Sequence, residues 1–247
     1  MTNKSIVITG ASDGIGKALA WEMAARGYHL GLTARRIELL EVLKSDIQKQ
    51  HPTVEVYVQV MDVTEYEQQN AIFTALQQQL GSIDIVVVNA GIAISGKTGE
   101  MPLSDQLAVI NTNLNGAIAS VSAVLAIFRQ QGYGHLVATS SIAAYRGLAR
   151  NAAYCASKSG LSTFMEAVRV ETHKENIDIS VLHPGYIDTE INRSLKSRPF
   201  VINVEKGACI FADLIERKVS AATVPKFPWN MVAPLLKVLP TAVIAKM

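Results

Sequence analysis

A tyrosine and a lysine four positions apart, Tyr154 and Lys158, could carry proton-transfer chemistry. They stand in a stretch with helical periodicity, so their side chains share one face of the helix. A tyrosine with a pKa near 10 is a poor acid–base group at neutral pH, and a neighbouring ammonium group favours the phenolate. We therefore expect Lys158 to lower the pKa of Tyr154 and to be free to bond a cofactor ribose. Such a pair also arises by chance, so its meaning depends on its context.

A glycine-rich loop provides part of that context. The segment TGASDGIG ends a strand-like run and precedes a helical pattern. Gly10 permits a tight exit from the strand, Gly14 lets the backbone approach a pyrophosphate, and Gly16 lets the helix pack against the sheet. The spacing is G-x-x-x-G-x-G and differs from the common G-x-G-x-x-G fingerprint. A dinucleotide-binding loop is predicted, and a glycine loop without a ligand is the alternative.

The end of the second strand bears on the type of dinucleotide. Arg35 and Arg36 stand where an acidic residue would bond the adenosine ribose, and the first acidic residue is Glu38. Arginine can grip a 2′-phosphate through two hydrogen bonds, which favours NADP(H) over NAD(H). The alternative is that the two arginines only begin a solvated helix.

Apolar runs rich in β-branched residues alternate with helical patterns, which predicts right-handed βαβ units. The fold class expected is α/β: a single Rossmann-like, doubly wound parallel sheet of about seven strands with helices on both faces. Residues 1–247 are predicted to form one catalytic domain. Within it, residues 184–204 are expected to be an irregular flap before a helix near 205–218, and residues 225–247 an apolar tail. The strand-like runs begin at Ser5, Tyr28, Val54, Ile83, His135 and Ile177.

Composition excludes several classes of protein. The net charge is +2 and the basic residues are scattered, which argues against a nucleic-acid surface. Two cysteines, Cys155 and Cys209, have no metal-ligand spacing, so a reduced, cytoplasmic protein without a metal site is expected. Cys155, His135 and His183 are interpreted as core residues. No signal peptide is expected, and prolines divide the tail into pieces too short to span a membrane.

Several motifs in order resemble the classical short-chain dehydrogenase/reductase family over about residues 4–225. The pair Asp62-Val63 resembles its adenine-contacting residues, and Asn89-Ala90-Gly91 its motif after the fourth strand, although Val88 stands where the family usually has a second Asn. The glycine loop, which includes Ser12, Asp13 and Ile15, and the segment Pro184-Gly185 with Ile187 and Thr189 complete the cofactor-binding set that the resemblance implies.

The same resemblance implies a catalytic mechanism. Ser141, thirteen positions before Tyr154, would hydrogen-bond a substrate carbonyl, with Ser140 as an alternative. Tyr154 would donate a proton to the oxygen while NADPH delivers hydride to the carbon. Lys158 and a water held by Asn113 would connect Tyr154 to solvent.

The function expected is an NADPH-dependent oxidoreductase acting on a carbonyl or secondary alcohol of an unidentified, apolar small molecule. A 3-oxoacyl-carrier-protein reductase is an alternative, with Arg146 and Arg150 as the candidate basic contacts, and a non-catalytic NADP-sensing protein is another. A homodimer or homotetramer is predicted. Pro234 and Pro240 should limit the tail to short helices that cover the substrate site and a neighbouring subunit, and membrane contact through the tail is possible but less favoured.

Overall fold

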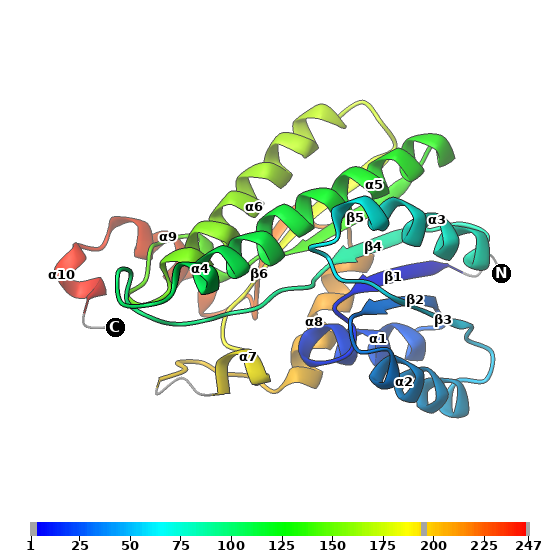
Figure 1. Ribbon diagram of the computed structural model, residues 1–247, viewed down its shortest axis with the longest axis horizontal. Coiled ribbons are helices and arrows are strands. Elements are labelled where there is room, and N and C mark those ends of the chain that lie inside the picture. The colour runs from blue at the N-terminus through cyan, green and yellow to red at the C-terminus, as the bar shows by residue number, and fades with distance from the viewer. Residues whose placement is uncertain (1–3, 194–196, 246–247) are drawn as a thin grey trace.

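A computed structural model describes residues 4–193 and 197–245 and contains one parallel sheet of seven strands. The spatial order is β3-β2-β1-β4-β5-β6-β7 (Figure 1), so the chain reverses direction across the sheet between β1 and β4. This arrangement confirms the predicted doubly wound α/β fold. The strands are β1 Ser5–Thr9, β2 His29–Ala34, β3 Val56–Val60, β4 Ile85–Val88, β5 Gly134–Thr139, β6 Ile177–Pro184 and β7 Ala221–Val224.

Alternate side chains of the strands pack against helices on the two faces of the sheet. Ile6 and Ile8 of β1 join one core with α1 (Gly14–Ala25), α2 (Ile37–Gln50) and α8 (Val204–Glu216). Val7 joins the other core with α3 (Gln69–Leu80), α5 (Gly116–Gln131) and α6 (Ala152–Glu171). Because both faces are covered, the strands are apolar almost throughout, which made six of them recognisable in the sequence. The short edge strand β7, with its exposed Ala221, was not predicted.

The sequence analysis assigned no helix to the segment between β4 and β5. It contains α4 (Leu103–Ile110), the π-helical turn η2 (Asn111–Asn115) and α5, which run on as one rod. The rod Leu103–Gln131 is long and apolar enough for a membrane span, but half of its most apolar window is buried. Val121, Val124 and Phe128 are fully buried against the sheet, so the rod is a core helix of this fold.

The expected flap is more ordered than predicted. Strand β6 continues to Pro184, Ile187 forms a β-bridge with Ile202, and α7 spans Glu190–Arg193. Arg198 forms an ion pair with Asp188. The prediction of an irregular segment over residues 184–204 therefore holds for much of its length and is wrong at Pro184, Ile187, Glu190–Arg193, Ile202 and Val204, and residues 194–196 lie outside the described residues. These long-range pairings leave no local periodicity in the sequence.

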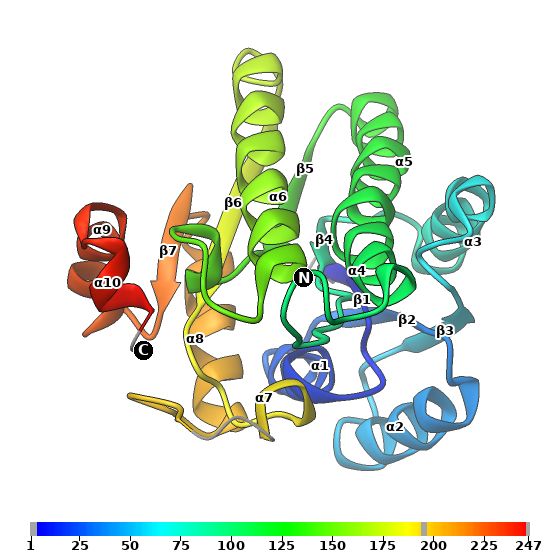
Figure 2. The same cartoon turned by 60° about the vertical axis from the view of Figure 1, so that its left-hand side comes forward.

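The tail forms α9 (Trp229–Val238) and α10 (Thr241–Ile244) beyond the edge strand β7 (Figure 2). Pro234 lies inside α9, so the expectation that it limits the helix is wrong. Proline removes the hydrogen bond to the carbonyl of Asn230, and both residues are exposed, so water can replace that bond. Pro240 does separate α9 from α10, as predicted.

Candidate active site

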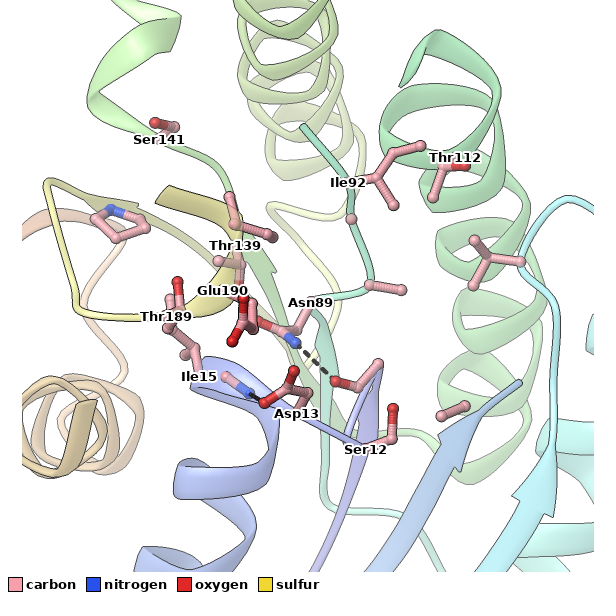
Figure 3. Close-up of a pocket in the computed structure, with 18 of the residues that line it drawn as sticks. Ser12, Asp13, Ile15, Asn89, Ile92, Thr112, Thr139, Ser141, Thr189 and Glu190 are labelled. Atoms are coloured by element: carbon pink, nitrogen blue, oxygen red, sulfur yellow. Dashed lines mark hydrogen bonds between the residues drawn. The ribbon is translucent and has the colours of Figure 1, made fainter. Parts of the chain in front are cut away.

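The carboxyl ends of the strands border a cleft of about 440 Å³, located where the strand order reverses. In Figure 3 it extends from Ser12 and Asp13 on one side to Ser141 on the other. Of the predicted site residues, Asn113 and Gly16 are the two that do not line it. The predicted residues that do line it are Gly10, Ser12, Asp13, Gly14, Ile15, Arg35, Arg36, Asp62, Val63, Asn89, Ala90, Gly91, Ser141, Tyr154, Lys158, Pro184, Gly185, Ile187 and Thr189.

The glycine loop leaves no room for side chains at two of its glycines. Gly10 has a φ of +67°, and a Cβ there would lie 2.8 Å from the Cα of Ala90. A Cβ on Gly16 would contact the carbonyl oxygen of Gly10 and lie 2.7 Å from Nδ2 of Asn89. That amide donates a hydrogen bond of 3.0 Å to the carbonyl of Thr9. The loop therefore brings the start of α1 directly against the ends of β1 and β4.

The amino terminus of α1 faces the cleft and suits an anion. Asp13 caps the helix by accepting a hydrogen bond of 2.7 Å from the backbone N–H of Gly14. The first turn contains no acidic residue, so the positive end of the helix dipole is not neutralised within the helix. A dinucleotide pyrophosphate fits this loop, since Gly10 and Gly14 line the cleft without side chains and let a ligand approach the backbone at the helix start.

The two arginines lie at the opposite end of the cleft from Ser141. Arg36 Nη2 donates to the hydroxyl of Ser12 at 3.2 Å, and Arg35 Nη1 lies 4.0 Å from a carboxylate oxygen of Asp62. Both guanidinium groups are more than half exposed. Burial by itself raises the pKa of Asp62, but hydrogen bonds from Thr64 and the charge of Arg35 hold it below its ordinary value. Two cations and a hydroxyl thus border the place where a 2′-phosphate would lie.

Ser141 and Tyr154 meet at the catalytic end. Ser141 caps the 3-10 turn η3 (Ile142–Ala144), and its Oγ accepts from the N–H of Ala143 at 3.1 Å. Burial raises the pKa of Tyr154, while a hydrogen bond with Ser141 lowers it. Ser140 instead donates to the backbone carbonyl of Lys158 at 3.0 Å. The geometry therefore favours Ser141 over Ser140 as the substrate contact.

Lys158 is buried beside this pair. Its Nζ donates to the carbonyl of Thr139 at 2.8 Å and lies 5.9 Å from the centre of the Tyr154 ring. Burial lowers the pKa of Lys158 to about 8. The expectation that Lys158 lowers the pKa of Tyr154 is wrong in this arrangement, because Nζ bonds a backbone carbonyl and burial dominates at the phenol.

Asn113 lies in the π-helical turn η2 and is fully buried. Its side-chain oxygen accepts from the N–H of Ile92 and its amide donates to the carbonyl of Ile92, both at 2.8 Å. A Cβ added to Gly91 would lie 3.2 Å from Asn113 Oδ1 and 3.5 Å from Lys158 Nζ. Because Gly91 has no side chain, Asn113 Oδ1 and Lys158 Nζ both border the open space beside its Cα. A proton relay through both residues stays a prediction.

The segment after β6 closes the cleft. A Cβ on Gly185 would overlap the indole of Trp229, whose Nε1 is buried without a hydrogen-bond partner, and Thr189 packs against Gly14. Glu190 points into the cleft near Asp13 (Figure 3), and its carboxylate pairs with Arg193 at 2.6 Å. The sequence did not predict that Glu190 lines the cleft, because the position of α7 depends on the bridge between Ile187 and Ile202. Ser140, the predicted alternative to Ser141, also lines the cleft, and the other lining residues not predicted are Ala34, Met61, Ile92, Thr112, Thr139, Ile191 and Asn192.

Three residues interpreted as core residues are buried. The thiol of Cys155 accepts a hydrogen bond from the N–H of Leu148, and burial raises its pKa. Burial lowers the pKa of both His135 and His183 to about 4, so both are neutral at pH 7. Among residues 4–193 and 197–245, no group of three or more potential metal-ligating side chains gathers.

The comparisons with known proteins agree on one family. A model of the short chain dehydrogenase family matches residues 4–199. An uncharacterized oxidoreductase of Mycobacterium tuberculosis is 36% identical over 241 residues, which cover 97% of this chain and 95% of that protein. The NADP-dependent 3-hydroxy acid dehydrogenase of Schizosaccharomyces pombe is 32% identical over 194 residues, which cover 78% of this chain and 74% of that protein. The structure of a short chain dehydrogenase/reductase from Burkholderia phymatum in complex with NAD superposes with a TM-score of 0.84 at 21% identity, covering 93% and 91% of the two chains.

Proposed function

This chain belongs to the short chain dehydrogenase family and is an oxidoreductase of that type, and on this premise we propose that it reduces a carbonyl group of an apolar small molecule with NADPH. The observation that carries the proposal is the layout of the cleft. Ser141, Tyr154 and Lys158 stand at one end, and Arg35 and Arg36 at the other, with the glycine loop between them. A dinucleotide lying along this cleft would have its phosphates at the loop and its nicotinamide beside Tyr154.

Each catalytic side chain has a role that its environment supports. Bound NADPH would supply the hydride that adds to the carbonyl carbon. Ser141 positions the carbonyl oxygen, and Tyr154 gives its proton to that oxygen as it becomes an alcohol. Because burial raises the pKa of Tyr154, the phenol keeps its proton at neutral pH, which suits an acid in the direction of reduction. Lys158, with a pKa of about 8, is mostly protonated at pH 7, so it can bond the ribose and would be a source of the proton that returns to the Tyr154 phenolate after transfer.

The preference for NADPH rests on the arginine pair. Relatives and structural neighbours include a protein named NADP-dependent and one bound to NAD, so family membership alone leaves the cofactor open. Arg35 and Arg36 together with Ser12 supply five or more donors where a 2′-phosphate would lie. Of the nearby carboxylate of Asp62, Oδ1 accepts both hydrogen bonds from Thr64, and Oδ2 lies 4.0 Å from Arg35 Nη1.

The preference for an apolar substrate rests on the apolar cluster that begins at Ile142, the residue after Ser141. Ile142, Trp229 and Leu236 are buried together in one cluster. Tyr145 and Tyr186 pack against that cluster, and the ring of Tyr186 contacts Trp229 edge-on at 6.0 Å. An apolar cluster beside the Ser141 end of the cleft favours ketones or aldehydes with apolar substituents over charged sugars or acids.

A substrate and cofactor panel tests the proposal. Purified protein is assayed with apolar ketones, aldehydes and 3-oxoacyl thioesters, each with NADPH and with NADH, and both dissociation constants are measured. We expect turnover of apolar carbonyls and tighter binding of NADPH. Arg35→Asp should cost about 1.5–3 kcal/mol of NADPH affinity, and the exposed control Arg217→Ala should change nothing.

Three outcomes would contradict this function. Equal dissociation constants for the two cofactors would refute the NADPH assignment. Turnover restricted to 3-oxoacyl thioesters would favour the carrier-protein reductase. NADPH binding without turnover of any carbonyl would favour the non-catalytic sensor.

A further inference from the structure

Helix α9 is apolar on two opposite faces, and only one of them is covered. Trp229, Ala233 and Leu236 are buried against the body of the protein. On the other face, Met231, Leu235 and Val238 are 64%, 53% and 75% exposed. Phe227, just before the helix, is 73% exposed. Soluble proteins rarely leave neighbouring large apolar side chains in water.

These four residues form one continuous strip, here called the outer stripe. Met231, Leu235 and Val238 are spaced by four and three positions, so they fall on the same side of α9, and Phe227 precedes the helix by two positions. Val243 of α10 is also exposed. Both views place α9 and α10 at one end of the molecule, beyond the edge strand β7 (Figures 1 and 2). A flat partner can therefore reach the outer stripe without meeting the rest of the fold.

The charge around the outer stripe has a single sign. From Ser220 to Ala245 the sequence contains two basic residues, Lys226 and Lys237, and no Asp or Glu. Lys226 and Lys237 are exposed and lie at the two ends of the stripe. The ammonium group of Lys237 lies 5.3 Å from the ring centre of Tyr145, whose pKa is raised by burial and by Glu166 of α6.

We propose that the outer stripe docks on an anionic lipid surface. An apolar stripe lying in the interface plane and flanked by lysines is the arrangement that binds the boundary between headgroups and acyl chains. A second copy of the chain fits less well. A two-fold interface would set stripe against stripe and bring the lysines of both copies together, with no acidic residue in residues 217–247 to offset them. An anionic membrane supplies the missing counter-charge.

Docking there would also orient the catalytic site. The covered face of α9 places Trp229 against Gly185 and packs Leu236 in the cluster with Ile142, the neighbour of Ser141. The substrate end of the cleft would thus lie near the membrane, where apolar carbonyl compounds concentrate. This consequence rests on the proposed function, whereas the docking itself does not.

Vesicle sedimentation tests the docking without any measurement of activity. Full-length protein is mixed with vesicles of phosphatidylcholine alone, or of phosphatidylcholine with about one-third phosphatidylglycerol. We expect sedimentation with the anionic vesicles, weakened by high salt, and little with the neutral ones.

Matched variants separate the apolar from the charged contribution. Leu235→Ser and Val238→Ser should each weaken vesicle binding by about tenfold, and Val42→Ser, an exposed valine of α2, should not. Lys226→Gln and Lys237→Gln should each weaken binding by about fivefold, and Lys49→Gln on α2 should not. All six positions are exposed, and circular dichroism checks that the variants remain folded.

Three results would overturn the proposal. No binding to anionic vesicles would refute it directly. Equal binding to neutral and anionic vesicles would refute the role of charge. A lower molar mass of Leu235→Ser or Val238→Ser by light scattering, with unchanged vesicle binding, would assign the outer stripe to a contact between copies of the chain.

Discussion

Replacing Lys158 with methionine should stabilise the folded chain although it removes a group assigned to catalysis. Lys158 is 4% exposed, and burial lowers its pKa from 10.5 to about 8. A difference of that size between the folded and unfolded pKa corresponds to about 3 kcal/mol of destabilisation at pH 7. Methionine has a similar length and no charge, so it fills the site without this cost.

Part of the gain is offset by a lost hydrogen bond. Lys158 Nζ donates to the carbonyl of Thr139, and loss of that bond costs about 1 kcal/mol. The expected net gain is about 2 kcal/mol at pH 7, which for a chain of this length raises Tm by about 4–8 °C.

The pH dependence identifies the cause. Between pH 8 and 10.5 the unfolded chain keeps the lysine proton that the folded chain has released, so the stability of the wild type rises with pH in that window. The advantage of Lys158→Met should therefore shrink from pH 7 to pH 10. Urea unfolding at both pH values, at one protein concentration, measures this. A variant that is less stable at pH 7, or equally more stable at both pH values, would refute the reasoning.

Three further predictions follow from the packing. Gly16→Ala should destabilise the fold by about 1–3 kcal/mol and weaken NADPH binding, because the added Cβ would clash with Gly10 and Asn89. The control Gly147→Ala, whose Cβ would have no neighbour within 4 Å, should change neither the urea unfolding curve nor the cofactor titration. Burial holds the pKa of His183 in the folded chain at about 4, so below pH 6.5 the unfolded chain binds this proton first and the wild type loses stability. His183→Gln should therefore lose about 2 kcal/mol less of its free energy of unfolding between pH 7 and 4.5 than the wild type does. We also predict a homodimer or homotetramer through the outer side of α6, where Val170 is exposed, and a monomer at micromolar concentration by light scattering would exclude it.

The sequence alone located those candidate site residues whose positions are set by residues close to them in the chain. The glycine loop and the spacing of Tyr154 and Lys158 are local patterns, and the alternation of strands and helices brings their segments to the same edge of the sheet. The arginine pair could be located because it directly follows a strand. These features could be placed at one edge of the sheet without knowing any contact between distant residues.

Features set by long-range packing could not be predicted. The direction of the pKa shift of Tyr154 depends on how much of the phenol the fold covers. The position of Glu190 depends on the bridge between Ile187 and Ile202. The outer stripe was visible as apolar residues, but only the packing of α9 decides which of its two apolar faces is covered.

The role of Tyr154 is the centre of this account, and one comparison of variants tests it most directly. Steady-state NADPH oxidation with the best carbonyl substrate is measured for the wild type, for Tyr154→Phe and for the exposed control Tyr66→Phe, together with the NADPH dissociation constant of each. The account predicts that Tyr154→Phe loses at least about 100-fold in kcat while its NADPH affinity stays near that of the wild type, and that Tyr66→Phe is normal in both. Retention of most of kcat by Tyr154→Phe would contradict the assignment of Tyr154 as the proton donor.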